Sequence, residues 1–485
     1  MILLCLFIVL FAWSGILHAF SQQQANYELA NEFQAFGLGG NFTANSLNLW
    51  PNEINGTDKF WFEFHTTVGK DYYFVDPERR LKEPLFDKGK LASGIAQITR
   101  GVVDRNKLEL SDIKFSENLA SFSFSYKGRN YEYNRLTHQI VEKKKEKSRS
   151  LFDRYSWMKY SPDRKYLVYV KKHNLYVKGN GEMGMDTTEV QLTTDGVRYY
   201  SYAHDGGTDE EGEVMSDICW CPDSRHLYLV REDERLLRDF WVINSLDDRP
   251  SLTTYRYEFP GDKNELVIVD VIGRTVKKTD ISKWPDQYIN PLCVTKDSKY
   301  LFFERTKRTW DEVDLCSVNL STMEVKEIIH EVDKPYRDPH ARSVAILNDG
   351  KDILFRSERT GWGHYYHYDG NGKLKNVMTS GEWVAGQIAS IDTLGRTVYL
   401  YGYGREKDID PSYYMLYKVH IDREGVTPLS TEDGQHQVKF LKSNRYYIDT
   451  YSRVDMEPKI MLKDNKGQGI LELAKPDGKN RNVLL

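Results

Sequence analysis

The densest group of side chains that could bind a charged ligand is an acidic stretch at residues 204–213, HDGGTDEEGE. It combines one histidine with five carboxylates: His204, Asp205, Asp209, Glu210, Glu211 and Glu213. Carboxylates form charge-assisted hydrogen bonds with ammonium groups, and they also bind cations. Most exposed acidic loops are only solvated, so at this point a solvated loop and a ligand site both remain open.

Motifs of hydrolytic and metal chemistry do not occur elsewhere. The sequence contains no G-x-S-x-G, the motif of an α/β-hydrolase nucleophile, and no H-E-x-x-H or C-x-x-C. His364 and His367 lie three apart in GHYYHYD, a spacing that puts them on opposite faces of a strand. We therefore expect no metal site and no cofactor.

Four cysteines follow the first segment of the chain, and their spacing matches no zinc pattern. Cys219 and Cys221 are too close together on one predicted strand to bridge each other. One disulfide, between Cys293 and Cys316, is compatible with the sequence in an oxidising compartment.

A repeated decamer indicates which elements position these residues. SPDRKYLVYV at 161–170 returns as CPDSRHLYLV at 221–230, and looser copies begin near residues 116, 295, 347 and 392. In each copy a turn cluster precedes a short alternating strand, and the Asp after the Pro suits a turn former better than a catalyst. A second strand often follows, as in HNLYV, DFWVIN, DLCSVNLS and HYYHYDGNGK.

The repeat predicts an all-β fold. Hairpin-bearing units recur about every 51 residues, near the upper end of propeller repeat lengths. We therefore expect a β-propeller of about eight four-stranded blades over residues 51–470, with a tail at 471–485. A pair of antiparallel sandwiches is the alternative, but it would not require the decamer to recur through the chain.

The start of the chain and its charge suggest where the protein works. Residues 1–21 resemble a signal peptide, with an uncleaved anchor as the alternative, and residues 22–50 carry helical spacing. The protein is therefore expected in the periplasm or outside the cell, with no membrane contact beyond the signal segment. A net charge of -4 without a basic stripe gives no electrostatic footprint for a nucleic-acid partner, so we expect none.

Three stretches carry a family resemblance: QLTTDGVRYYSYAHD, DICWCPDSRHLYLVREDERLLRDFWVINSL and RPSLTTYRYEFPGDKN. Together they resemble the N-terminal propeller of dipeptidyl peptidase IV, a prolyl-oligopeptidase-type serine peptidase. The resemblance implies an eight-bladed propeller that caps an α/β-hydrolase domain, limits access to peptides and takes part in proteolysis. Counted back from Trp220, it also places Glu210 and Glu211 where relatives bind the substrate's amino terminus, although the aromatic residues of that motif are missing.

The resemblance also separates recognition from catalysis. Because this chain lacks the nucleophile motif, we expect it to be non-catalytic by itself, so its status as an enzyme is open. The partners it implies are a peptide substrate or a separate α/β-hydrolase domain, and a homodimer is a further expectation. A stand-alone propeller that binds peptides, glycans or proteins is the alternative function.

Overall fold

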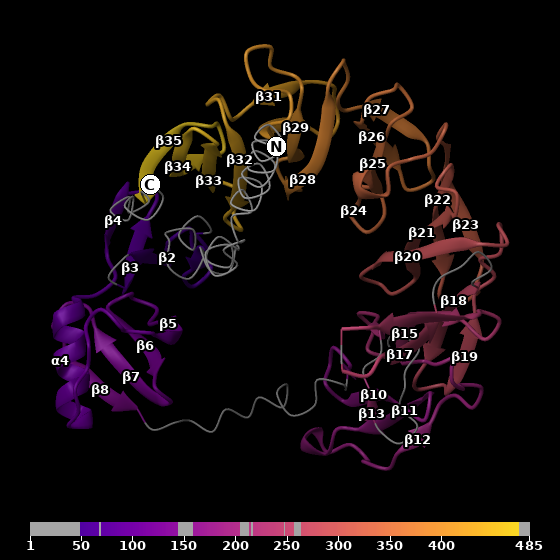
Figure 1. The fold of residues 1–485 in the computed structure, drawn as a ribbon, viewed down its shortest axis with the longest axis horizontal. Coiled ribbons are helices and arrows are strands. Elements are labelled where there is room, and N and C mark those ends of the chain that lie inside the picture. Colours follow the sequence, from indigo (N-terminus) through magenta and orange to yellow (C-terminus); the bar gives the residue numbers. More distant parts are fainter. Residues whose placement is uncertain are drawn as a thin grey trace, which may run out of the picture. The chain divides into compact units, whose positions relative to one another are not determined.

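The computed structural model describes residues 49–66, 69–143, 159–203, 213–214, 217–246, 248–256 and 263–474. The predicted signal peptide and N-terminal helix lie outside these residues. The chain divides into two compact units, one formed by residues up to 145 together with residues from 436 onward, and the other by residues 146–435. Figure 1 shows the elements in chain order.

Unit 1 holds the first two sheets and the last one. Sheet 1 contains β1 (Asn52–Glu53), β2 (Phe60–Thr66), β3 (Gly69–Asp76) and β4 (Leu81–Pro84). Sheet 2 contains β5 (Ser111–Phe115), β6 (Ser121–Tyr126), β7 (Arg129–Asn134) and β8 (Ile140–Lys143). Sheet 8 contains β32 (Gln435–Phe440), β33 (Tyr446–Arg453), β34 (Met456–Asp464) and β35 (Gly469–Ala474).

Unit 2 holds five consecutive sheets and an inserted hairpin. Sheet 3 contains β9 (Lys159–Tyr160), β10 (Tyr166–Lys171), β11 (Asn174–Gly179), β12 (Val190–Gln191) and β13 (Glu213–Val214). Sheet 4 contains β14 (Cys219–Trp220), β15 (His226–Asp233), β18 (Lys263–Asp270) and β19 (Thr275–Lys278). The hairpin consists of β16 (Asp239–Asn244) and β17 (Ser251–Arg256).

The remaining sheets of unit 2 are four-stranded. Sheet 5 contains β20 (Gln287–Val294), β21 (Tyr300–Lys307), β22 (Glu312–Asn319) and β23 (Val325–Val332). Sheet 6 contains β24 (Val344–Leu347), β25 (Asp352–Ser357), β26 (His364–Asp369) and β27 (Leu374–Val377). Sheet 7 contains β28 (Val384–Asp392), β29 (Thr397–Tyr403), β30 (Met415–His420) and β31 (Val426–Pro428). Among the described residues, the 3-10 helices Gly181–Met183 and Pro339–Ala341 lie in connections.

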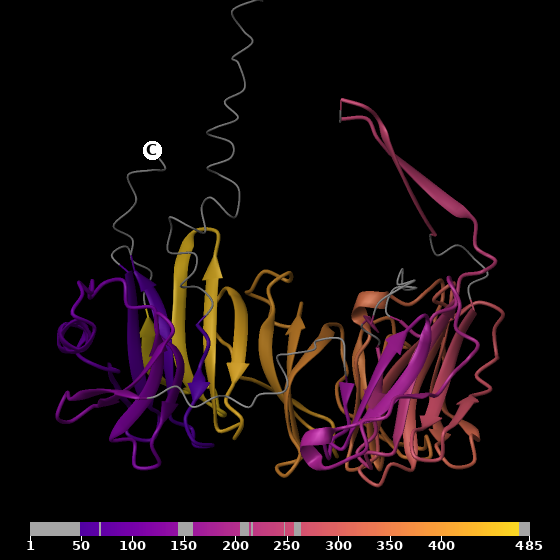
Figure 2. The same ribbon diagram turned by 90° about the horizontal axis from the view of Figure 1, so that it is seen from below.

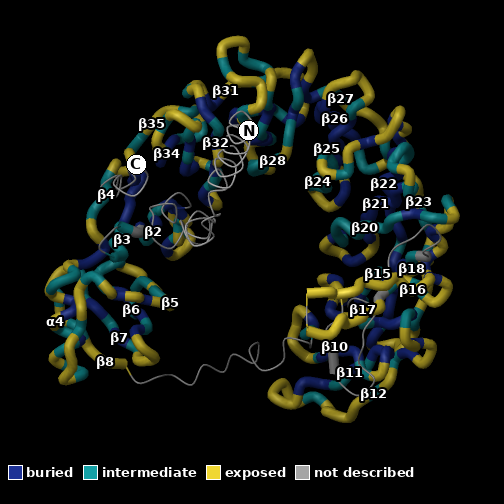
Figure 3. Tube along the Cα trace, in the orientation of Figure 1, coloured by how far each residue is buried: buried dark blue, intermediate teal, exposed yellow. Residues whose placement is uncertain are grey.

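This arrangement confirms the predicted all-β propeller fold with eight blade sheets. In the described residues seven of these sheets have four strands and sheet 3 has five, and the pairs in each sheet are antiparallel. Buried residues lie along the strands and exposed residues lie at the turns (Figure 3). This burial follows from the alternating aromatic and aliphatic pattern of the decamers.

Apolar clusters join neighbouring sheets within each unit. In unit 1 the last sheet packs on the first, through residues such as Phe62 of β2 and Ile460 of β34. Sheets 1 and 2 share a second cluster, in which the rings of Phe86 and Tyr133 meet edge to face at 6.3 Å. In unit 2, further clusters connect sheet 3 to 4, 4 to 5, 5 to 6 and 6 to 7.

Sequence patterns did not predict α4 (Lys88–Thr99), the α-helix in the described part of unit 1. Asp87 caps its first turn, and the helix ends at Arg100, which has a left-handed backbone with φ of 54°. Leu91 and Ile95 lie four apart and are buried, so one face of the helix packs against the sheets.

DFWVIN forms a strand as predicted, but it does not pair with the strand of the preceding decamer. These residues form β16, which pairs only with β17, whereas β15 takes β18 as its next strand in sheet 4. The hairpin is therefore an insertion between the second and third strands of a blade. Figure 2 shows it extending away from the sheet into which it is inserted.

The four cysteines of the described chain are all free thiols, so the disulfide that the sequence left open is not formed. Cys293 lies on β20 and faces the cluster shared with sheet 6, whereas Cys316 lies on β22 and faces the cluster shared with sheet 4. Two thiols on opposite faces of one sheet, with β21 between their strands, cannot bond. Burial raises the pKa of Cys316 to about 12.

Across the described ranges, no helix has both the length and the apolar character that crossing a membrane requires.

Candidate functional site

Described residues on both sides of the acidic stretch bond to sheet 3. Its residues 204–212, with His204, Glu210 and Glu211, lie outside the described residues. On its N-terminal side, the N–H of Tyr202 donates to the carbonyl of His173 at 3.1 Å. On its C-terminal side, β13 pairs with β10 through Val214 and Val170. Tyr202, which precedes the stretch, and β13, at its C-terminal end, are therefore both held by hydrogen bonds to one blade.

A buried guanidinium holds the chain just before the acidic stretch. Arg231, on β15 of the neighbouring sheet, has no exposed side-chain surface, and its Nη1 donates to Asp195 Oδ2 at 2.8 Å. Its Nη2 donates to the carbonyl of Tyr200 at 2.7 Å. The guanidinium carbon lies 3.2 Å from the ring centre of Tyr200 and 4.0 Å from that of Tyr202. Arg231 thus bonds to the backbone of this loop and stacks between two of its tyrosines.

The stack continues on the outer side of Tyr200. The guanidinium carbon of Arg235 lies 4.0 Å from the centre of the Tyr200 ring, and Asp233 holds Arg235 through two hydrogen bonds of 2.7 and 2.6 Å. The Tyr200 hydroxyl donates to Glu265 at 2.7 Å, and Lys278 donates to the same hydroxyl at 2.5 Å. Cations and tyrosine rings therefore alternate from Arg235 through Arg231 to Tyr202.

Charge and burial keep these groups in fixed protonation states. Burial raises the pKa of Tyr200 and of Tyr202, so both phenols stay protonated at neutral pH. Burial alone would raise the pKa of Asp195, but the bonds from Arg231 outweigh it and lower that pKa. The side chain of Asp233 also has a lowered pKa, chiefly because it accepts from Arg235.

The same loop contacts the base of the projecting hairpin. Arg256, the last residue of β17, lies over the ring of Tyr199 with its guanidinium carbon at 3.9 Å. Arg256 also donates to the carbonyl of Glu234, whose N–H in turn donates to the carbonyl of Tyr199. The hairpin and the start of the acidic stretch therefore share one support, which we call the arginine–tyrosine stack (Tyr199, Tyr200, Tyr202, Arg231, Arg235 and Arg256).

The chemistry of this arrangement is positioning. Tyr200 and Tyr202 are neutral and the arginines are cationic, and their polar side-chain atoms bond mainly to Asp195, Asp233, Glu265 and nearby backbone carbonyls. Such a support can hold carboxylates of the acidic stretch in place for a ligand ammonium, but it offers no paired general acid and base.

Within the described part of the chain, two clusters have the side chains for a metal ion: Asp314 with Glu327 and His330, and Glu432 with His436 and Asp449. In the first, Lys283 and Arg305 approach Asp314 at 2.8 and 2.7 Å. In the second, Lys463 lies 2.9 Å from Asp449. In the first cluster these two cations balance Asp314 and Glu327, and in the second Lys463 pairs with Asp449, so the chemistry of both clusters is that of ion-pair networks.

The two histidines of GHYYHYD have different partners. His364 bonds Thr379 and the carbonyl of Gly381, at 3.1 and 2.9 Å, and its burial lowers its pKa. The Nε2 of His367 contacts Asp352 at 2.6 Å. Each ring is used in its own buried network.

Sequence reasoning missed the arginine–tyrosine stack. The tyrosines of YYSY and the arginines of REDERLLRD are visible in the sequence, but nothing local shows that the second stretch reaches across to the first. Only the closeness of sheets 3 and 4, which share an apolar cluster, brings them together.

A family model and the curated relatives that match this chain all point to the same family. Residues 111–458 match the family model of the dipeptidyl peptidase IV (DPP IV) N-terminal region. A probable dipeptidyl peptidase 4 of Trichophyton verrucosum is 21% identical over 332 residues, which are 64% of this chain and 43% of that protein. A probable dipeptidyl peptidase 4 of Emericella nidulans is 23% identical over 326 residues, 61% of this chain and 40% of that protein.

Solved structures show the same fold. Dipeptidyl peptidase 4 of Porphyromonas gingivalis superposes with a TM-score of 0.57 at 20% identity, covering 92% of this chain and 62% of that one. A putative dipeptidyl aminopeptidase IV from Bacteroides ovatus gives 0.56 at 16% identity, covering 89% of this chain and 62% of that one.

The chain spans about two fifths of the length of the curated relatives it matches. The matched model, however, covers well over half of the chain itself, including the arginine–tyrosine stack and both flanks of the acidic stretch. The chain therefore belongs to the family defined by the N-terminal region of dipeptidyl peptidase IV.

Proposed function

We propose that the chain is the exported, peptide-recognising propeller of a dipeptidyl-peptidase-IV-like serine peptidase. Glu210 and Glu211 would receive the amino terminus of the peptide through charge-assisted hydrogen bonds. The observation that carries this proposal is the anchoring of the acidic stretch at both ends, by β13 pairing on β10 and by Arg231 under Tyr200. A fixed base lowers the entropy lost when flexible carboxylates close on a ligand.

The proteolytic chemistry would come from outside these residues. Acyl transfer needs a nucleophile, a base and oxyanion donors, and the sequence has no G-x-S-x-G. We infer that an α/β-hydrolase domain supplies them and that the propeller controls which peptides reach it.

Chromogenic Xaa-Pro and Xaa-Ala dipeptide substrates test this division, with a serine-reactive fluorophosphonate label run in parallel. The purified chain is expected to give neither turnover nor a labelled serine. Turnover together with a labelled serine would place the nucleophile within the chain and end the proposal. An active peptidase of the same family serves as the positive control.

Export follows from residues 1–21, an apolar segment that ends in small residues. The protein would lie in the periplasm or outside the cell. Amino-terminal sequencing of the protein from its native host checks the cleavage, which is expected close to Ala19. An intact Met1 in a membrane fraction would mean an anchored protein instead.

We also propose that two copies associate through the hairpin. All six residues of β16 are exposed, among them Trp241 and Ile243, and Leu252 of β17 lies directly opposite Ile243. An isolated two-stranded hairpin is marginal in water, and neither strand has a second neighbour among the described residues. Identical edges related by a two-fold axis can pair antiparallel, which would bury these side chains in one dimer.

The alternative is a stand-alone propeller that binds glycans or envelope proteins. The arginine–tyrosine stack favours the peptidase-derived proposal, because it supports an acidic stretch suited to an ammonium and offers no open aromatic face to a sugar. Binding of neutral oligosaccharides in preference to peptides with a free amine would favour the alternative.

A further inference from the structure

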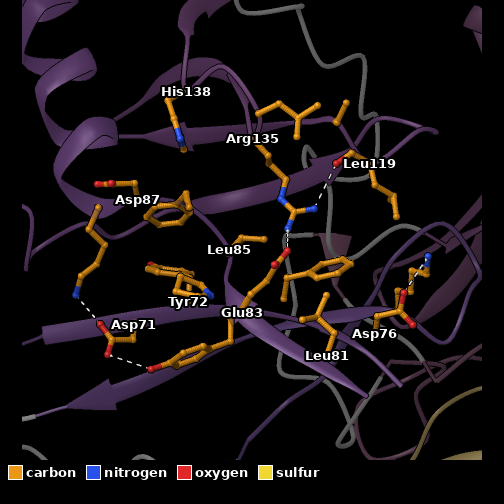
Figure 4. Close-up of a pocket in the computed structure, with 18 of the residues that line it drawn as sticks. Asp71, Tyr72, Asp76, Leu81, Glu83, Leu85, Asp87, Leu119, Arg135 and His138 are labelled. Atoms are coloured by element: carbon orange, nitrogen blue, oxygen red, sulfur yellow. Dashed lines mark hydrogen bonds and ion pairs between the residues drawn. The ribbon is translucent and has the colours of Figure 1, made fainter. Parts of the chain in front are cut away.

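Unit 1 contains a cavity of about 1180 Å³ between sheets 1 and 2, beside the start of α4. Figure 4 shows the side chains that line it. Small-molecule sites occupy roughly 300–1,000 Å³, so this cavity has room for a ligand somewhat larger than a drug-sized molecule. Neither the proposed peptidase function nor the acidic stretch uses it.

The floor of the cavity is apolar and fixed. Phe74, Leu85 and Phe86 line it and also belong to the core shared by sheets 1 and 2. The Tyr72 hydroxyl donates to the carbonyl of Leu108 at 2.8 Å and so ties the floor to the segment that follows α4. The floor therefore does not need to reorganise when a ligand enters.

Three ion pairs line the walls and neutralise one another. Lys88 lies 2.5 Å from Asp71, and Lys59 lies 3.2 Å from Asp76. Arg135 lies 2.8 Å from Glu83, as Figure 4 shows. The guanidinium of Arg135 also stacks on the ring of Phe74. These six charged groups leave no net charge.

The charges that remain are mostly positive. Arg79, in the turn between β3 and β4, and Arg105, after α4, both line the cavity. Neither guanidinium has an acidic partner among the residues that the structure describes. Asp87 is the remaining carboxylate of the lining, but it caps α4 by accepting from the N–H of Lys90 at 2.9 Å, and this bond lowers its pKa. Its charge is offset by the positive end of the helix.

We propose that this cavity binds a short acidic peptide whose carboxylates alternate with apolar side chains. The carboxylates would pair with Arg79 and Arg105, and the apolar side chains would lie on Leu81, Leu119 and Leu136, which line the cavity and are more exposed than its floor. Alternate side chains of an extended peptide point to opposite sides, which suits a lining that holds separate apolar and cationic groups. A polyanionic sugar fits less well, because the rings of Tyr72 and Phe74 are only 3% and 5% exposed and present no open stacking face.

Fluorescence anisotropy tests the proposal with a labelled, N-acetylated hexapeptide of alternating Glu and Leu. Acetylation removes the amine on which the proposed peptidase function depends, so the two ideas fail separately. We expect saturable binding that weakens as salt is raised, because the added ions screen the pairs. The same peptide with Lys in place of Glu should not bind.

Charge reversal assigns the binding to this cavity. Arg79→Glu with Arg105→Glu should lower the affinity for the acidic peptide at least tenfold, and because both side chains are exposed the fold should survive. The matched control is Arg423→Glu in unit 2, an exposed arginine that does not line this cavity, which should bind as the unmodified chain does. No saturable binding, equal binding by both variants, or displacement by a sulfated oligosaccharide at lower concentration than by the unlabelled peptide would overturn the proposal.

Discussion

The backbone N–H of Asp163 donates to the side-chain Oγ of Ser224 in the next blade, at 3.0 Å. Asp223 makes the same bond to Ser298 one blade further, also at 3.0 Å, and the N–H of Lys296 donates to Asp349 in the blade after that. The repeated decamer therefore does more than form a turn. Its turn also joins each sheet to its neighbour from sheet 3 to sheet 6.

Ser224→Ala should destabilise unit 2 by about 1–2 kcal/mol, because it leaves a partly buried N–H without its acceptor. Urea unfolding followed by tryptophan fluorescence measures the change. Ser321→Ala, at an exposed turn serine that makes no such bond between sheets, should change the free energy of unfolding by less than about 0.5 kcal/mol. Equal effects of the two substitutions would contradict the role of the turn.

Arg231→Lys should cost about 2–4 kcal/mol, since a lysine cannot bond Asp195 and the carbonyl of Tyr200 while stacking between two rings. The loss should be larger than that of Arg198→Lys, an exposed arginine beside Tyr199. Thermal unfolding of both variants, with near-ultraviolet circular dichroism as a report on the tyrosines, measures this difference. If Arg231→Lys left both the thermal unfolding and the circular dichroism unchanged, the stack could not be the support of the acidic stretch.

Asp352 should make the free energy of unfolding depend on pH in the acidic range. Burial would raise its pKa, but Arg396 at 2.8 Å, His367 at 2.6 Å and Lys375 at 3.2 Å outweigh burial and hold the pKa well below its usual range. As pH falls, the unfolded chain therefore takes up this proton first, near pH 4, and the folded chain only at lower pH. The stabilisation is complete above about pH 5 and is lost as pH falls towards the folded pKa.

Asp352→Asn should flatten the fall in the free energy of unfolding between about pH 5 and pH 2, and it should also lower stability at neutral pH. Chemical unfolding at several pH values tests both effects. Asp248→Asn, at an exposed carboxylate, should leave the pH dependence unchanged. An unaltered pH profile in Asp352→Asn would show that other groups carry the acid sensitivity.

The hairpin should control association. Trp241→Glu with Ile243→Glu would place charges in the proposed two-fold contact and should shift the protein from dimer to monomer in light scattering after size exclusion. Leu394→Glu, at an exposed leucine in the turn between β28 and β29, is the matched control and should remain dimeric. A monomeric unmodified chain, or a dimeric hairpin variant, would contradict the proposed dimer.

Most of the fold was predictable, because each decamer contains its own turn and strand signals. Asp163 and Asp223 act as predicted: each accepts backbone N–H groups inside its turn, as from Lys165 at 3.1 Å and Arg225 at 2.9 Å. The projecting hairpin was not predictable by this route. DFWVIN has the alternation of an ordinary blade strand, and only the pairing of β15 with β18 excludes it from the sheet.

The candidate site was only partly predictable. Local composition identifies the acidic stretch, but its support comes from Arg231, which lies 31 residues after Tyr200 and reaches it only because two sheets pack together. The cavity of unit 1 depends on α4, whose capping and apolar spacing are present in the sequence but are surrounded by strand signals. Local sequence patterns therefore did not predict the contacts between segments that are distant in the sequence.

Titration calorimetry with matched peptides measures whether the acidic stretch recognises a peptide amino terminus. A hexapeptide beginning Ile-Pro, with a free amine, should bind the chain, and its N-acetylated form should bind at least tenfold more weakly. Glu210→Gln with Glu211→Gln should reduce the affinity of the free peptide to that of the acetylated one. Equal affinity of both peptides, or binding of neither, would contradict recognition of the amino terminus by the acidic stretch.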